Sequence, residues 1–573
     1  MSQRDRSSTQ RWFDRGDLRV LVAAIVAVAL AARLIDLGTR IAHWDEARVA
    51  YWTVRAVDTG AWTYRPIIHG PLLQHVARWL FSTVGTSDFV MRLPVAVVGG
   101  LLPAVALCFR SRLRRREVVA LAVVLAADPL VLYYGRFFRN DVPVAAFALL
   151  ALGAGVRAID ADDPRWWSIA GLAAGLALAT KENALLYPLA WAGAGVLTLA
   201  LARVGGRRPT WPDATVVREY WRGAWPWIAG AGAIAFAVVI FAYAPRTAGP
   251  TGGLNDLATD PASLGPVIEA ATVGAAGDLI DLWIAGGMRD HSYPLYLGYD
   301  IVVLIAGSLG TIAAAAVGVA RDRRPIVVFG TVWGLTSIVG YAYVADVRAP
   351  WLAVHAIVAL AIPAAVGLVA LADRARHSTP GVGLDYRRSG AIALLAVVAV
   401  HTAVVGGVLA YHHPEPRVNF LAQGAQPGDN FRPTMDRVAA IAAVTNGPDI
   451  AWAGGYAVAN ETATRSPPPP GGWLDRLPLP WYVERADATQ VSVADPAALD
   501  DPPPVVIAPA SDRARFGPHL PGYDATEFAR FRHGENTTYR IGPWSKRVEG
   551  RSTVVWIDRD ALDRARTGPT RDH

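Results

Sequence analysis

The chain has 573 residues, of which 53% are hydrophobic, and its formal net charge is +7. It repeatedly runs about 20 apolar residues without a charge, the length that crosses the hydrocarbon core as a helix, which excludes a soluble globular protein. A single cysteine, Cys108, excludes an intramolecular disulfide and a cysteine-rich metal site. The basic excess is almost wholly arginine in short loops, so it indicates membrane topology rather than nucleic-acid binding.

After a polar tail, residues 1–17, about eleven apolar segments are predicted to cross the membrane. Arginine clusters follow alternate segments, so the positive-inside rule places these loops and the N-terminus in the cytoplasm. Asp128-Pro129 predicts a kink in the third segment. Arg33, near the end of the first, either faces protein or reaches the headgroups. The segments are Leu18–Leu37, Ser87–Phe109, Val118–Tyr134, Val142–Val156, Trp167–Ala179, Ala184–Ala202, Ala224–Tyr243, Pro294–Ala320, Ile326–Val344, Leu352–Ala372 and Gly390–Tyr411.

The first predicted outer loop, residues 38–86, carries an adjacent pair of acids, Asp45 and Glu46. Acids favour helix N-termini, so the pair can cap the helix that follows, or it can supply a general base or metal ligand. That helix is predicted to be amphipathic, with Arg48 and Arg55 opposite an apolar face. We expect it to lie in the membrane interface. The apolar face consists of Ala47, Ala50, Tyr51 and Val54.

The other ionisable residues also concentrate on predicted outer turns rather than at the centres of the spans, which argues against a pump or ion-coupled transporter. These turns can converge on one outward cavity that contains both acids and cations. Cations there are suited to binding phosphate. Lys181 is notable because the chain has only one other lysine. The turn residues are His69, Arg136, Arg139, Asp141, Lys181, Glu182 and Arg348.

Two further parts lie outside the membrane in this topology. Residues 245–293 form a long glycine-rich outer loop, and residues 412–573 form a soluble appendix to the membrane domain, residues 18–411. In the appendix, Phe431–Val444 is predicted as a helix and three short apolar runs as strands, which indicates a small α/β domain. The predicted strands are Asp449–Trp452, Val505–Ala508 and Val554–Ile557.

These motifs together resemble the membrane glycosyltransferases of the GT-C fold, in particular the family 39 group that is similar to protein O-mannosyltransferases. Asp45-Glu46 matches the acidic pair of that family's first outer loop. His69-Gly70-Pro71-Leu72 resembles its His/Lys-Pro-Pro-Leu turn. Tyr133-Tyr134-Gly135-Arg136 resembles its Tyr-x-x-Arg stretch, and Thr180-Lys181 its Thr-Lys ending of a glycine-rich span. The resemblance runs from Leu18 to Val204 and weakens in later spans.

The archaeal branch known as flippase-activity-associated is more similar still. Its late outer turn reads Lys-Thr-Pro-Trp, where this chain has Arg348-Ala349-Pro350-Trp351, so the cation is kept although the residue differs. Leu477–Tyr482 also resembles the outer domain of that branch. The resemblance implies an archaeal owner, a mainly α, GT-C-like membrane domain and a polyprenyl (dolichyl) phosphate sugar donor.

The resemblance also implies a mechanism. Asp45 is the general base that takes a proton from an acceptor hydroxyl while its oxygen attacks the anomeric carbon of the sugar. Glu46 orients the acceptor, or holds a divalent cation if one is used. Single displacement predicts inversion, while two-step retention stays open. The substrate-binding residues are His69, Arg136, Arg139, Asp141, Lys181, Glu182 and Arg348, with the cations on the departing lipid phosphate.

Simpler roles stay open for these residues. Arg136 and Arg139 can be interface anchors, His69 an ordinary interface histidine, and Asp141 the start of a helix. The whole chain can instead be a non-catalytic partner that helps to flip or present lipid-linked sugar. Either way, we expect a multi-pass cell-membrane protein with an outer C-terminal domain. Its expected partners are polyprenyl-phosphate-linked sugar, a glycan or protein acceptor, and membrane lipid, with no certain cofactor.

Overall fold

The computed structural model describes residues 17–204, 214–247, 252–285, 292–345, 349–376, 385–414, 419–467, 469–531, 537–541, 544–548 and 552–567. The chain forms two compact units. The first, here the membrane unit, comprises Met1–Asp36, Trp62–Leu73 and Leu93–His412. The second, the sheet unit, comprises Leu37–Ala61, Gln74–Arg92 and His413–His573, so two segments of the first predicted outer loop belong with the C-terminal residues.

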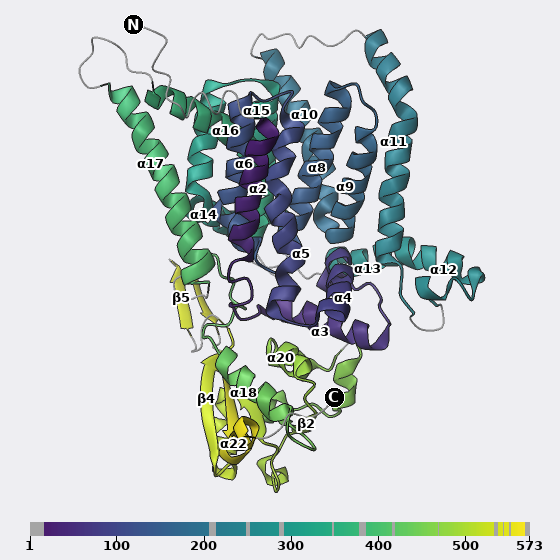
Figure 1. Ribbon diagram of the computed structural model, residues 1–573, viewed down its shortest axis with the longest axis vertical. Helices are drawn as coiled ribbons and strands as arrows, with labels where there is room; N and C mark the ends of the chain where they lie inside the picture. Colours follow the sequence, from purple (N-terminus) through teal and green to yellow (C-terminus); the bar gives the residue numbers. More distant parts are fainter. Residues whose placement is uncertain are drawn as a thin grey trace. The chain divides into compact units, whose positions relative to one another are not determined.

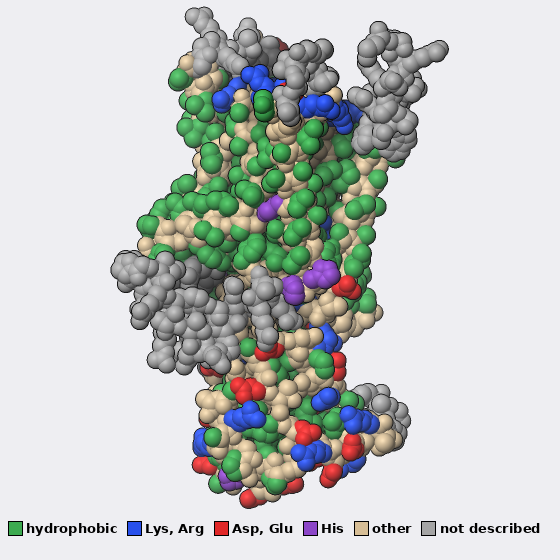
Figure 2. All heavy atoms as spheres, turned by 90° about the vertical axis from the view of Figure 1, so that its left-hand side faces the viewer, with side chains coloured by type: hydrophobic (Ala, Val, Ile, Leu, Met, Phe, Trp, Pro, Cys, Tyr) green, Lys and Arg blue, Asp and Glu red, His purple; other side chains and the backbone are tan. Residues whose placement is uncertain are grey.

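The membrane unit is helical throughout its main body (Figure 1). Figure 2 shows hydrophobic side chains over most of its visible face, and basic side chains gathered at one end. The principal helices are α2 (Leu18–Leu34), α6 (Arg115–Ala127), α7 (Pro129–Tyr134), α8 (Asp141–Asp160), α9 (Trp166–Thr180), α10 (Leu186–Val204), α11 (Ala214–Tyr243), α14 (Tyr293–Arg321), α15 (Pro325–Val344), α16 (Ala353–Arg376) and α17 (Tyr386–Gly407). Shorter ones are η1 (Pro66–Ile68), η2 (Leu102–Phe109), η3 (Glu182–Leu185), α12 (Leu264–Glu269), α13 (Ala275–Leu279), η8 (Ile280–Ala285), η9 (Pro350–Leu352) and η10 (Val408–His412).

Within the described residues, eight helical segments are long and apolar enough to cross a membrane, and each coincides with a predicted span. The other three predicted spans contain shorter helices. Helix α2 has 17 residues and α9 has 15. The third span is broken where α6 ends before Asp128 and α7 starts at Pro129, which confirms the predicted kink. Arg33 is fully buried and donates to two backbone carbonyls, so it faces protein.

Helix α16 forms the interior of the membrane unit, because it packs against α14, α15, α6 and α17 and is buried along nearly its whole length. Its contact with α14 depends on two glycines. A Cβ on Gly367 would lie 1.8 Å from the Ala314 carbonyl oxygen, and one on Gly318 would lie 1.9 Å from that of Pro363. Small residues of this kind allow helix backbones in membranes to approach closely.

The sheet unit contains a five-stranded sheet in the order β2-β1-β3-β7-β4, in which β1 pairs parallel to β2 and β3 while β7 runs antiparallel to β3 and β4. The predicted α/β domain is therefore present. The strands are β1 (Ile450–Ala453), β2 (Gln490–Val493), β3 (Val505–Pro509), β4 (Tyr523–Ala529) and β7 (Ser552–Asp558), with a separate hairpin of β5 (Thr537–Ile541) and β6 (Trp544–Val548). The helices are α3 (Trp44–Thr59), α18 (Arg432–Ala442), α19 (Gly471–Arg476), α20 (Leu479–Arg485), α21 (Arg513–Phe516) and α22 (Arg559–Thr567), while α4 (Leu72–Val84) and α5 (Asp88–Leu101) contribute to both units.

Helix α3 has the predicted amphipathic face, but protein covers it. The four apolar residues of that face are all buried. The ring of Tyr51 lies 4.9 Å from that of Trp473 in α19, and α3 packs on α20. The expectation that this face lies in the membrane interface is therefore wrong, because the C-terminal part of the sheet unit already covers it.

Candidate active site

The two acids of the first predicted outer loop, Asp45 and Glu46, lie in the first turn of α3 but in different surroundings. His43 is the N-cap residue: its Nδ1 accepts the backbone N–H of Asp45 at 3.0 Å, and its own N–H donates to Glu46 Oε2 at 2.9 Å. This reciprocal arrangement is a capping box, which satisfies backbone donors that a helix start otherwise leaves open. Glu46 therefore fulfils the capping role that the sequence left open.

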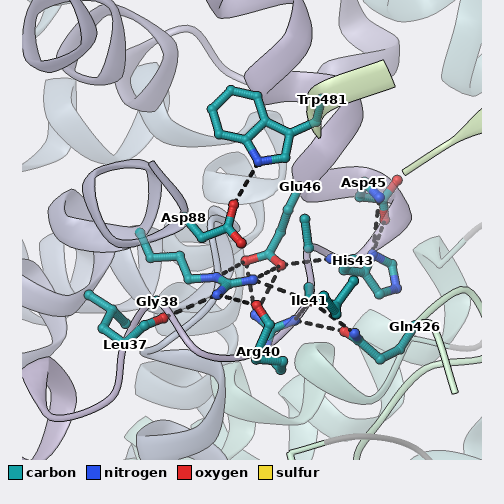
Figure 3. Close-up of polar contacts among 12 residues, drawn as sticks. Leu37, Gly38, Arg40, Ile41, His43, Asp45, Glu46, Asp88, Gln426 and Trp481 are labelled. Carbon is teal, nitrogen blue, oxygen red and sulfur yellow. Dashed lines mark hydrogen bonds and ion pairs between the residues drawn. The ribbon is translucent and has the colours of Figure 1, made fainter. Parts of the chain in front are cut away.

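Glu46 is also the centre of a buried ion-pair cluster (Figure 3). Arg92 donates from Nε to Oε1 at 3.0 Å and from Nη2 to Oε2 at 2.9 Å. Arg40 donates from Nη2 to Oε1, also at 3.0 Å. Burial alone would raise the pKa of Glu46, but the two guanidinium groups outweigh it and hold the pKa well below its usual range. Both carboxylate oxygens are thus engaged.

Asp45 keeps a more accessible carboxylate, because a quarter of its side-chain surface is exposed, against none for Glu46. Arg48 Nη2 contacts its Oδ1 at 3.2 Å, and His43 Nδ1 lies 3.7 Å from its Oδ2. A partly exposed carboxylate in this position can accept a proton from a substrate hydroxyl. Of the acidic pair, Asp45 therefore has the more accessible carboxylate, whereas Glu46 anchors the start of α3.

Residues of the C-terminal part hold this loop in place. Gln426 accepts from Arg40 Nη1 at 2.7 Å and donates to the Ile41 carbonyl at 3.1 Å. Asp88, at the start of α5, accepts from Trp481 Nε1 at 2.7 Å and from Arg432 Nη2 at 2.5 Å. A buried carboxylate with several donors is well compensated, so the loop around Asp45 is rigidly supported from residues far away in the sequence.

In the membrane unit, the predicted residues Asp141, Lys181 and Arg139 lie together where α8 begins and α9 ends. Lys181 Nζ donates to Asp141 Oδ1 at 2.8 Å, and Arg139 Nε lies 3.8 Å from Asp141 Oδ2. The guanidinium of Arg139 stacks over the ring of Trp351 at 3.5 Å from its centroid. Asp141 also begins α8, as the simpler interpretation predicted.

One member of this cluster was not predicted. His355 of α16 is fully buried, and its Nε2 lies 3.4 Å from Asp141 Oδ1. Its Nδ1 lies 2.6 Å from the Tyr187 hydroxyl, and the ring stacks on Tyr341 at 4.1 Å between centroids. The signal was an ionisable residue within an apolar span, which by itself indicates a functional candidate.

His69 and Glu182 form a second polar group in the same unit. His69 Nδ1 lies 3.5 Å from Glu182 Oε2, and the Tyr64 hydroxyl donates to Glu182 Oε1 at 2.7 Å. His69 adopts a positive φ of 64° and stacks on Trp283. The next residue, Gly70, lies so close to the Thr180 carbonyl that a Cβ would be 2.5 Å from it, so the His-Gly-Pro-Leu turn lies against the Lys181 turn.

The structure does not place two of the predicted cations, Arg136 and Arg348, in the Asp141 cluster. Arg136 donates to four backbone carbonyls at the end of α2, those of Ala32, Arg33, Ile35 and Asp36, and its guanidinium lies over the Tyr411 ring. It therefore closes the C-terminus of α2 instead of joining the Asp141 cluster. Arg348 lies outside the described residues. Within the part of the chain that the structure describes, no group of three or more His, Cys, Asp or Glu residues fits a metal ion.

The sequence matches two family models. The family described as dolichyl-phosphate-mannose-protein mannosyltransferase matches residues 68–212, a range that contains Arg139, Asp141 and Lys181 as well as His69 and Glu182. The Agl23 flippase-associated protein C-terminal domain matches residues 431–558. Asp45 lies outside both ranges. No curated protein matches the chain in sequence.

Solved structures share the fold over most of the chain. ArnT from Cupriavidus metallidurans in the apo state is 16% identical with a TM-score of 0.53, and the match covers 93% of this chain and 97% of ArnT. The Archaeoglobus fulgidus oligosaccharyltransferase in the apo form is 12% identical with a TM-score of 0.51, covering 94% and 77%. The chain thus shares the fold of these two structures and is a multi-pass membrane protein, similar to the mannosyltransferase family over residues 68–212 and to the Agl23 flippase-associated C-terminal domain over residues 431–558.

Proposed function

We propose that this protein is a glycosyltransferase that moves a sugar from a polyprenyl-phosphate donor to an acceptor hydroxyl at the outer membrane face. The observation that carries the proposal is the difference in burial and contacts between the two adjacent acids, Asp45 and Glu46. Glu46 is buried between two arginines, whereas Asp45 presents a partly exposed carboxylate from a helix turn that Glu46 and His43 hold rigidly. The match to the mannosyltransferase family supports the same reaction class.

In this proposal Asp45 acts as the general base. It accepts the proton of the acceptor hydroxyl while the acceptor oxygen forms a bond to the anomeric carbon, and the bond from that carbon to the lipid phosphate oxygen breaks. A single displacement inverts the anomeric configuration. Glu46 acts through Asp45 by fixing the start of α3, so we assign it a positioning role and neither an acceptor contact nor a metal.

The leaving lipid phosphate gains negative charge and requires cations that are already in place. Lys181 and Arg139 supply them, since Asp141 and Trp351 hold both side chains in defined positions. The Glu182–His69 group, one residue further along the chain, offers hydrogen-bonding atoms for the sugar. Arg136 is not included, because its guanidinium already serves the end of α2.

The test compares two aspartates of α3. Asp45 and Asp58 each pair with an arginine three residues away, Arg48 and Arg55, but Asp58 is at the far end of the helix and 48% exposed. Membranes of a strain that lacks the gene supply the acceptor, and the purified protein receives labelled polyprenyl-phosphate hexose. Asp45→Asn should lower transfer about 10²–10⁴-fold, while Asp58→Asn keeps the wild-type rate. Equal transfer by both variants would refute the proposal.

The C-terminal match supports a second candidate, a non-catalytic partner in the presentation of lipid-linked sugar. For such a protein Asp45→Asn should restore the glycan profile of the deletion strain as well as the wild-type gene does. Substitutions in the sheet unit that leave the fold intact should instead remove a binding partner. Failure of Asp45→Asn to restore the profile, at normal protein levels, decides for the enzyme.

A further inference from the structure

The ring of His43 is held in a single tautomer. Its Nδ1 accepts the backbone N–H of Asp45, so this nitrogen carries no proton. Its Nε2 lies 2.9 Å from Gln423 Oε1. That oxygen also accepts the backbone N–H of Ala425 at 2.7 Å, which identifies it as the carbonyl end of the amide. The backbone N–H groups of Asp45 and Ala425 thus assign a role to each ring nitrogen: Nδ1 accepts from Asp45, and Nε2 donates to Gln423.

Other residues of the sheet unit bury the ring of His43. The ring is 1% exposed. Asp45 Oδ2 faces Nδ1 at 3.7 Å, and Glu46 accepts the backbone N–H of His43. Among the described residues, the charged neighbours include Arg48, which pairs with Asp45, and Arg40 and Arg92, which pair with Glu46. From the C-terminal part, the strap of residues 423–426 adds Gln423 to the ring and the Ala425 carbonyl to the Trp44 N–H at 3.3 Å.

Histidine is an unusual choice for this position. Asparagine, aspartate, serine and threonine are the preferred N-cap residues, and each accepts a backbone N–H without changing charge near neutral pH. Histidine caps only while Nδ1 is unprotonated. A proton on Nδ1 would remove the acceptor for the Asp45 N–H and place a donor 3.7 Å from the Asp45 carboxylate.

We propose that His43 is a positioning residue that makes Asp45 available as a base only while its imidazole is neutral, with Gln423 setting that state. When neutral, His43 holds the backbone of Asp45 and leaves its carboxylate to the substrate. When a proton from solvent binds Nδ1, the imidazolium pairs with the carboxylate and withdraws it. The strap of residues 423–426 would thereby give the C-terminal domain control over catalysis. This inference rests on the proposed function.

The experiment measures transfer by the full-length protein against pH, from about pH 8 to 5, where histidine side chains titrate. The wild-type rate should fall as the pH is lowered. His43→Asn keeps a capping oxygen but cannot titrate, so its rate should be a few-fold lower at pH 8 and then stay level. His519→Asn, an exposed histidine of the sheet unit, should keep the wild-type profile.

A second variant, Gln423→Glu, should move the decline in rate instead of abolishing it. A general loss of structure would not produce such a shift. Gln423→Glu replaces the amide oxygen by a carboxylate that favours the imidazolium, so the decline in rate should move to higher pH. In the double variant His43→Asn/Gln423→Glu the decline should be absent. An unchanged profile in Gln423→Glu, or a decline retained in His43→Asn, would overturn the proposal for His43.

These outcomes are separable from the failure of the proposed function. Full transfer by Asp45→Asn would overturn both, because no base would remain for His43 to position. Loss of transfer in Asp45→Asn together with a wild-type profile in His43→Asn would overturn only the role of His43.

Discussion

Asp45 and Glu46 follow each other in the first turn of α3, yet their carboxylates differ in burial and in the residues that they contact. Glu46 is enclosed with Arg40 and Arg92, which are 6% and 0% exposed, whereas Asp45 meets solvent. Removing one member of a buried ion pair costs more than the pair contributes, because the partner charge stays buried without compensation. The two residues should therefore differ in what their loss affects, stability for one and reaction rate for the other.

Glu46→Gln is expected to destabilise the fold by about 3–5 kcal/mol, since two buried guanidinium groups lose their counter-charge. Thermal unfolding of the purified protein in detergent should show a clearly lower Tm. Asp45→Asn, one residue away, should change the Tm less, because Asp45 is partly exposed and pairs with a single arginine three residues along the same helix, a kind of pair that contributes about 0–1 kcal/mol. An unchanged Tm for Glu46→Gln would contradict the view that this cluster stabilises the loop.

The contribution of Glu46 to folding stability should also appear in the pH dependence of the Tm. Because the pKa of Glu46 is lower in the folded than in the unfolded state, its charge stabilises the fold at any pH above the unfolded value of about 4.3. This contribution is lost as the pH falls below that value towards the folded pKa. The Tm of the wild type should fall more steeply than that of Glu46→Gln below about pH 5. Parallel curves would show that Glu46 does not contribute this term.

Among the helices, the crossing of α14 and α16 has the least room for change. Gly367 and Gly318 each meet a backbone carbonyl of the other helix at a distance that no side chain permits. Gly340 in α15 provides a contrast, because a Cβ there would meet nothing within 4 Å. His355 lies on the same helix, about three turns before Gly367.

Gly367→Ala should therefore force α14 and α16 apart at a cost of about 1–3 kcal/mol, as overpacking does in cores. We expect a lower Tm and a lower yield of folded protein, measured by size-exclusion chromatography in detergent. Gly340→Ala, also in a predicted span, should behave as wild type. A wild-type Tm for Gly367→Ala would mean that the two helices can separate at little cost.

For the molecule as a whole, the arginine clusters lead us to propose a cytoplasmic N-terminus and an outer sheet unit. Cysteine labelling can test this, because Cys108 is buried and is the chain's single cysteine. In a Cys108→Ser background, Ser511→Cys in the sheet unit should react with a membrane-impermeant maleimide in intact cells. Arg321→Cys at the end of α14 should react only after permeabilisation. The reverse pattern would invert the topology.

The features that were predictable from sequence are those with a local signal. Apolar length located the spans, and Pro129 located the break between α6 and α7. The apolar strands β1, β3 and β7 were found, but β2 and β4 were not. These two are the edges of the sheet, so they are short or polar and only partly buried. Their pairing comes from β1 and β7 rather than from their own sequence.

The site was predictable only in part, for the same reason. The acidic pair and the Lys181 turn have local patterns, but the partners of Glu46 and His43 do not. Arg92 is 46 residues from Glu46, and Gln423 is 380 residues from His43. His355 is a single histidine in an apolar helix, and only the folded unit brings it to Asp141. For Arg136, the sequence predicted a substrate-binding cation, but its guanidinium donates to backbone carbonyls at the end of α2, and no local pattern indicates those partners.

The burial of α16 determines which helices the surrounding lipid can affect. Nearly all of this helix touches protein, whereas most of α11 and α17 is exposed on the surface of the membrane unit. Hydrocarbon thickness and lipid composition therefore act first on those two outer helices. Helix α16 can carry His355 and Pro363 because protein rather than lipid surrounds it. We expect a change of membrane lipid to alter α16 less than α11 or α17.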